Sequence, residues 1–142
     1  MKIKTRDFGE VEINPNEIII FSDGLPGIVS SGNRFVILSD EQGGGPIYFM
    51  QSLDDEELAF VLVDMALILP EYVEAVAAEQ PAAGGLHIYN IATIHENLED
   101  STVNLKAPLI VDFAGKSGWQ VLCKSDEFPI RAKLFEEGGG AC

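Results

Sequence analysis

The chain has 142 residues, enough for one folded domain with its own core but few for two. Apolar residues make up 46% of it, which predicts a folded globule rather than a disordered chain. The formal net charge of −14 argues against direct binding to nucleic acid, because phosphate contact needs a basic surface. The start lacks the apolar core of a signal peptide, and Asp64 interrupts the apolar run 58–69. We therefore expect a cytoplasmic protein without a membrane span.

The apolar pattern along the chain is mostly that of short strands. In chain order, strands are predicted at 2–5, 9–13, 17–21, 34–39, 47–51, 58–64, 86–95, 107–113 and 119–124. A turn at 22–27, a Gly-rich loop at 40–46 and a hairpin loop at 114–118 separate some of them. About nine strands at this spacing predict a mainly β fold, a single-domain antiparallel β-barrel-like sandwich.

One or two short helices complete the predicted fold. Residues 70–79 begin with Pro70, are rich in Ala and end just before Pro81, which predicts a helix. Its inward face would carry Tyr72, Val73 and Val76. In segment 52–57, Ser52 is followed three residues later by an acidic residue, which predicts one helical turn. We expect residues 1–135 to form the domain and 136–142 to form a flexible Gly-rich tail.

The negative charge is concentrated in the middle of the chain. No Lys or Arg lies between Phe35 and Leu105, whereas the same stretch holds 13 carboxylates. They account for almost the entire net charge, because the two flanks nearly neutralise themselves. An acidic surface steers a basic partner towards it at low salt, although solubility alone would also account for the charge.

The residues that carry chemistry do not form a catalytic, cofactor or metal site in the sequence. His87 and His95 lie on one predicted strand, about 26 Å apart, too far to share an ion. Asp54, Asp55, Glu56 and Glu57 are consecutive, so they do not face one another across a cleft. We predict no enzyme. The alternative is a small-ligand-binding or hydrolytic β-barrel, which requires an internal cavity or converging carboxylates.

Four segments, in register over nearly the whole chain, resemble those of a known family. They are residues 1–13, 20–27 (IFSDGLPG), 51–61 and 102–111 (TVNLKAPLIV). Together they are similar to the flagellar assembly factor FliW family. Ser22 stands where that family usually has proline and Ile28 where it has an aromatic residue, so partner contact at this turn can differ.

The resemblance implies a regulator with a compact β-barrel-like fold and no cofactor. FliW proteins antagonise CsrA, a small RNA-binding protein that blocks translation of flagellin mRNA, and they also bind flagellin. When flagellin is secreted, the freed FliW captures CsrA and flagellin synthesis resumes. For this chain the resemblance implies CsrA and flagellin as partners, no direct contact with nucleic acid or membrane, and a monomer when free.

The acidic residues and the turn that holds Leu105, Lys106 and Pro108 are the predicted partner contacts. We expect Asp54, Asp55, Glu56 and Glu57, together with Glu71 and Glu74, to form an acidic docking field for basic CsrA. Leu105, Lys106 and Pro108 are further candidates, although Gly- and Pro-containing turns more often serve the fold. An acidic mimic of RNA would instead compete directly with RNA for CsrA.

Overall fold

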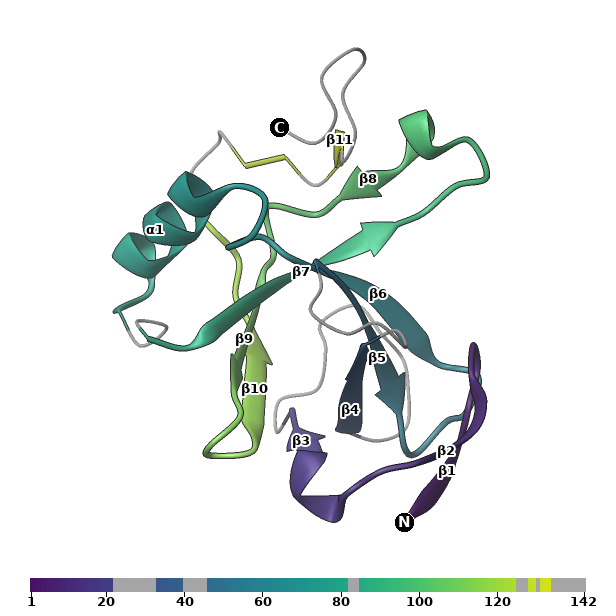
Figure 1. The fold of residues 1–142 in the computed structure, drawn as a ribbon. Helices are drawn as coiled ribbons and strands as arrows, with labels where there is room; N and C mark the ends of the chain where they lie inside the picture. Colours follow the sequence, from purple (N-terminus) through teal and green to yellow (C-terminus); the bar gives the residue numbers. More distant parts are fainter. Residues whose placement is uncertain (22–32, 40–45, 82–84, 125–127, 130, 134–142) are drawn as a thin grey trace.

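The computed structural model describes residues 1–21, 33–39, 46–81, 85–124, 128–129 and 131–133 (Figure 1). In chain order the elements are β1 (Lys2–Thr5), β2 (Gly9–Glu12), the 3-10 helix η1 (Pro15–Glu17), β3 (Ile19–Ile20), β4 (Arg34–Ser39), β5 (Ile47–Ser52), β6 (Ala59–Asp64), α1 (Pro70–Glu79), β7 (His87–Thr93), the 3-10 helix η3 (Leu98–Asp100), β8 (Thr102–Val103), β9 (Leu109–Asp112), β10 (Ser117–Gln120) and β11 (Ala132–Lys133).

Seven of these strands form a barrel-like sheet. The sheet runs β7-β6-β5-β4-β3-β10-β9 and is closed because β9 also pairs with β7. The pairings are antiparallel except for β3 with β10, which meet in parallel at Ile20 and Ser117. Beyond the barrel, β8 pairs with the C-terminal end of β7, and β11 pairs with β8. Strands β1 and β2 form a separate hairpin. The prediction of a mainly β, barrel-like single domain is confirmed.

Alternation along the strands divides the apolar residues between two faces of the sheet. On β6, Leu62 belongs to the cluster enclosed by the barrel strands, which includes Phe21, Phe35 and Leu109. Gly118 on β10 faces this cluster, where an added Cβ would stand 2.6 Å from the Phe21 ring, so the close packing requires glycine. The neighbouring Val63 points the other way, into a second cluster that α1 covers.

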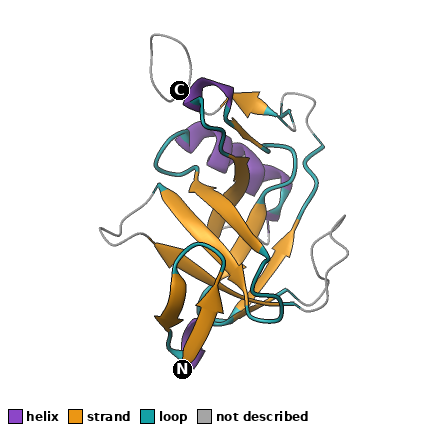
Figure 2. Ribbon diagram, turned by 90° about the vertical axis from the view of Figure 1, so that its right-hand side faces the viewer, coloured by secondary structure: helices purple, strands orange, loops and turns teal. Residues whose placement is uncertain are grey.

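The helix lies across the outer face of the barrel, at the end away from the N-terminus (Figure 2). It spans Pro70–Glu79 as predicted, and Tyr72 and Val76 are buried while Val73 is half-buried. A third, smaller cluster of Ile3, Ile13 and Val36 joins the β1–β2 hairpin to β4. The barrel therefore carries α1 on one part of its outer surface and the hairpin on another.

The predicted helical turn at 52–57 is wrong. Ser52 Oγ accepts hydrogen bonds from the amides of Asp54 and Asp55, each at 3.0 Å, as a helix cap would. The amide of Glu57 then bonds to Asp55 Oδ1 at 3.0 Å, and Leu58 closes a turn back to the Asp55 carbonyl. These local bonds to side chains compete with helical ones, and the segment returns directly into β6.

Other predictions differ in detail or fall outside the described residues. The last predicted strand ends at Gln120, so Cys123 is buried but lies beyond β10. The turn at 22–27, the Gly-rich loop at 43–45 and the tail at 136–142 lie outside the described residues. Within the part of the chain that the structure describes, no helix is both long and apolar enough to cross a membrane.

Candidate functional site

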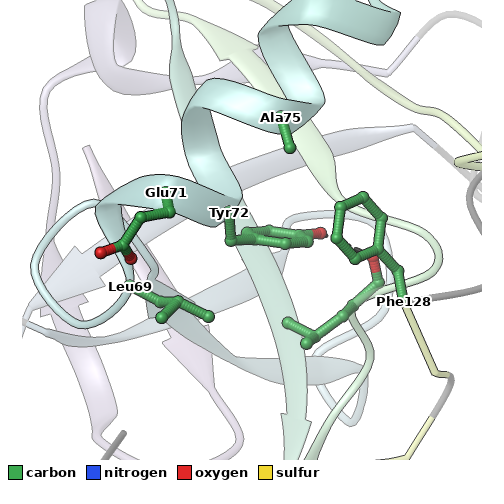
Figure 3. A pocket seen from close by; sticks show the side chains of 6 residues that line it. Leu69, Glu71, Tyr72, Ala75 and Phe128 are labelled. Carbon is green, nitrogen blue, oxygen red and sulfur yellow. Dashed lines mark hydrogen bonds between the residues drawn. The ribbon is translucent and has the colours of Figure 1, made fainter.

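A groove of about 320 Å³ lies beside α1 (Figure 3). The described residues that line it are Leu69, Glu71, Tyr72, Ala75, Leu105 and Phe128. Figure 3 shows the Tyr72 and Phe128 rings next to each other, with the Glu71 carboxylate on the side of Tyr72 away from Phe128. Five of these six side chains carry no charge, so the groove has an apolar centre with one acidic residue at its rim.

Tyr72 joins the helix to the floor of the groove. Its ring meets that of Phe128 edge to face, with centroids 4.9 Å apart. Its hydroxyl donates to the Leu105 carbonyl at 2.6 Å and accepts from Asn90 Nδ2 at 2.8 Å. Burial raises the pKa of the Tyr72 phenol well above its ordinary value, so the hydroxyl keeps its proton and remains a donor.

Hydrogen bonds hold the segment from Asn104 to Pro108 in one conformation. The Asn104 carbonyl accepts from Asn90 Nδ2 and the Leu105 carbonyl from Tyr72. The next three carbonyls, of Lys106, Ala107 and Pro108, accept from Cys123 N, Gln120 Nε2 and Val121 N. Asn104 Oδ1 also accepts from the amides of Lys106 and Ala107. The NLKAP motif therefore builds a fixed turn beneath the groove.

Of the three residues predicted in this turn, one reaches the groove. Leu105 is buried and lines it. Pro108 is buried next to the start of β9, and Lys106 is half-buried in the turn. Their positions agree with a role in the fold, and the Leu105 side chain remains a candidate for partner contact.

The four acidic residues after β5 do not share one environment. Asp54 forms an ion pair with Arg34, whose Nη2 lies 2.7 Å from Asp54 Oδ1. Hydrogen bonding by Arg34 lowers the pKa of the Asp54 carboxyl below its usual range. Asp55 holds the turn through its bond to the Glu57 amide. Glu56 and Glu57 are exposed, and their carboxylates form no ion pair or hydrogen bond with another described residue.

The structure separates the predicted acidic field into two parts. The loop with Asp54 to Glu57 precedes β6, whereas α1 follows the other end of that strand (Figure 1). The six residues of β6 span about 17 Å at the usual rise. Glu71 lies at the rim of the groove and Glu74 is exposed on the same helix. Of the six predicted acidic residues, only Glu71 lines the groove.

Sequence reasoning missed the polar side chains that position both regions. Asn90 is fully buried within an otherwise mostly apolar strand, and this break in the pattern is the signal that it has a specific partner. Gln51 is also buried, and it positions the loop that holds Asp54 to Glu57. Its Oε1 accepts from the Arg6 amide, and its Nε2 donates to the carbonyls of Ser52 and Glu56 at 3.0 and 3.1 Å. Phe128 stands in a short segment without a periodic pattern, so the local sequence does not predict its contact with Tyr72.

The geometry offers little to the alternative of hydrolytic chemistry. Among the described residues that line the groove, Glu71 is the single carboxylate, so no second acid converges on it. No group of three or more His, Cys, Asp or Glu residues is placed to hold a metal ion in the described part of the chain. What the groove does provide is apolar surface with an acidic edge.

Comparison with known proteins identifies the family. Residues 2–134 match the family model described as FliW protein. The chain belongs to the FliW family. It is 34% identical over 143 residues to the flagellar assembly factor FliW of Thermoanaerobacter pseudethanolicus, covering 96% of this chain and 95% of that protein. It is also 34% identical to that of Caldicellulosiruptor bescii, covering 94% and 90% of the two chains.

The fold agrees with the same family. A crystal structure of the flagellar assembly factor FliW superposes on the chain with a TM-score of 0.80 at 28% sequence identity. The match covers 97% of this chain and 99% of that one. The resemblance seen in the four sequence segments is thus confirmed, and the protein is a member of a family of flagellar assembly factors.

Replacing Tyr72 with Phe tests the link between α1 and the NLKAP turn. The substitution Tyr72→Phe leaves the buried Leu105 carbonyl without this donor, so we expect a loss of about 1–3 kcal/mol in the free energy of unfolding. Urea denaturation measures it. Tyr48→Phe is the matched control, because the Tyr48 hydroxyl makes no hydrogen bond to another described residue. Equal losses in the two variants would contradict the assigned role.

The ion pair of Asp54 predicts a dependence of stability on pH. Because the folded-state pKa is lowered, the carboxylate stabilises the fold above its unfolded pKa of about 3.9, and this contribution disappears as the pH falls through the folded value. Wild type should therefore be more stable than Asp54→Asn near pH 7, and the difference should shrink below about pH 4. Urea denaturation from neutral to acid pH measures this. A difference that stays constant over the range would refute the prediction.

Proposed function

We propose that the protein is a partner-switch regulator of flagellin synthesis. It binds and antagonises the translational regulator CsrA, which relieves repression of flagellin mRNA translation, and it binds flagellin as its other partner. It acts in the cytoplasm, as a monomer when free, without a cofactor or direct contact with nucleic acid. Membership of the FliW family supports the proposal, and the groove beside α1 is the observation that carries it.

The groove has the two properties that a docking site for a basic protein needs. Binding energy at interfaces comes mostly from a few apolar or aromatic anchors in a central pocket. Leu69, Tyr72 and Phe128 provide the walls of such a pocket. Glu71 adds negative charge at its edge, where charge complementarity selects the partner, and Glu74 is exposed on the same helix. We assign this groove to CsrA, a basic protein, whose docking segment then presents an apolar side chain flanked by Lys or Arg.

The acidic loop has a different part in the proposal. Asp54 and Asp55 are engaged in the ion pair and the turn, which leaves Glu56 and Glu57 free to act on a partner. Exposed charges away from the anchor mainly raise the rate of association and are screened by salt. Glu56 and Glu57 therefore steer CsrA towards the protein, and the groove holds it.

Filling the groove tests the docking site. Ala75 lines the groove, whereas Ala78, one turn along α1, is exposed to solvent. We expect Ala75→Trp to weaken binding of CsrA at least about tenfold, because the indole occupies the pocket, and Ala78→Trp to leave it unchanged. Calorimetric titration measures both, after circular dichroism has shown that each variant is folded.

The same titrations, repeated with flagellin already bound, test the switch. Exclusion of CsrA by flagellin supports it, whereas a complex containing all three proteins would refute the switch. If the protein with Trp at 75 binds CsrA like wild type, the groove is not the CsrA site.

Charge reversal in the acidic loop tests the steering role. We expect Glu56→Lys with Glu57→Lys to lower the association rate with CsrA several-fold at low salt, with little change in the dissociation rate. The effect should fade near physiological ionic strength. Surface plasmon resonance measures both rates. The pair Glu96→Lys with Glu99→Lys changes the net charge equally at another exposed loop, so an equal effect there would show that only total charge matters.

A further inference from the structure

A second cavity lies where β7, β8 and β11 meet. It has a volume of about 300 Å³, and the described residues that line it are Thr93, His95, Asp100, Thr102 and Arg131. Every one of these side chains is polar or charged, in contrast to the groove beside α1. Neither the resemblance nor the proposed function gives this cavity a role.

Strand register explains why these residues converge. Thr93 on β7 pairs with Thr102 on β8, and Thr102 pairs with Lys133 on β11. Residues directly opposite each other on neighbouring strands point to the same face of a sheet. His95, Asp100 and Arg131 lie two residues along the chain from Thr93, Thr102 and Lys133, outside the strands: His95 follows β7, Asp100 ends η3 and Arg131 precedes β11. Three short segments thus bring their polar side chains to one cavity.

The cavity is rich in hydrogen-bond donors. Arg131 offers a fork of guanidinium N–H groups, the two threonines offer hydroxyls, and the His95 ring offers an N–H. Arg131 is exposed and forms no ion pair with another described residue. Arg131 and Lys133 are two of only nine Lys and Arg residues in a chain of net charge −14. This local concentration of donors contrasts with the net negative charge of the chain.

Asp100 is the single acceptor-only side chain among the residues that line the cavity. A carboxylate beside bound anionic oxygen is unfavourable unless the ligand brings a hydroxyl that donates to it. Hydrogen phosphate carries such a P–OH group together with three acceptor oxygens. Sulfate has a similar size and shape but no proton to donate.

We propose that this cavity is a binding site for the phosphate group of a small molecule. Arg131 pairs with two phosphate oxygens, the hydroxyls of Thr93 and Thr102 donate to the remaining ones, and Asp100 accepts the P–OH hydrogen. His95 closes the side formed by the segment after β7. The volume exceeds what phosphate alone needs, so the cavity has room for inorganic phosphate as HPO₄²⁻ or for a small phosphate monoester in its singly protonated form, and both carry a P–OH group.

Nuclear magnetic resonance titration of the uniformly ¹⁵N-labelled full chain tests the site without any protein partner. Inorganic phosphate, glycerol 3-phosphate and sulfate are added at constant ionic strength. We expect phosphate to shift the amides of Thr93, Thr102 and Arg131 with a dissociation constant of about 1 mM, and sulfate to bind at least about tenfold more weakly. Tighter binding of glycerol 3-phosphate would identify a monoester site, and equal binding a site for the free anion.

Two variants and a control assign the roles. Arg131→Gln should weaken phosphate binding about tenfold or more, whereas Lys124→Gln, which removes the same charge from another exposed position, should not. Asp100→Asn should abolish the preference for phosphate over sulfate, because an amide can donate to either anion. Unchanged spectra at about 20 mM phosphate, equal binding of both anions by the unaltered protein, or an ineffective Arg131→Gln would each overturn the proposal.

Discussion

The groove depends on one buried hydroxyl. Tyr72 reaches from α1 to the Leu105 carbonyl and receives a hydrogen bond from Asn90, which also holds the Asn104 carbonyl. A buried carbonyl or amide without a partner costs about 1–3 kcal/mol. Each of these groups has its hydrogen-bond partner only when the others keep this arrangement. The network therefore fixes α1 over β7, keeps the NLKAP turn in place and sets the distance between Tyr72 and Phe128 that forms the groove wall.

The apolar groove beside α1 and the polar cavity lie at opposite ends of the same two chain segments. The segment of β8 and the NLKAP turn lies beside the segment of Phe128 to Lys133, joined by the Leu105 amide to the Pro129 carbonyl and by the β8–β11 ladder. At one end of this pair, Leu105 and Phe128 line the groove. At the other end, Thr102 and Arg131 line the polar cavity.

Local sequence patterns predicted the helix and the strands of this fold better than the contacts between them. Residues 70–79 were identifiable as a helix because Pro and Ala act locally, and the barrel followed from strands that alternate. The closure of β7 onto β9 pairs residues twenty or more positions apart, and no pattern within either segment predicts it. The turn at 52–57 was mistaken for a helix because Ser52 caps both structures equally well. For the site, Tyr72 was predicted to face inward, but its partners Asn90 and Phe128 are specified only by the folded geometry.

The distribution of charge shows most clearly that residues close together in the sequence need not lie together on the surface. All the carboxylates between Phe35 and Leu105 form one stretch of sequence, yet the loop that holds Glu56 precedes β6, which spans about 17 Å, and the helix that holds Glu71 follows the other end of this strand. At physiological salt the screening length is about 8 Å, so exposed charges separated by more than this distance act on a partner largely independently. In the proposed complex, charges next to the apolar groove contribute after docking, and Glu71 is the carboxylate that lines it. The more distant loop would act, in the same proposal, before contact, while the partner still senses the field of the whole acidic chain.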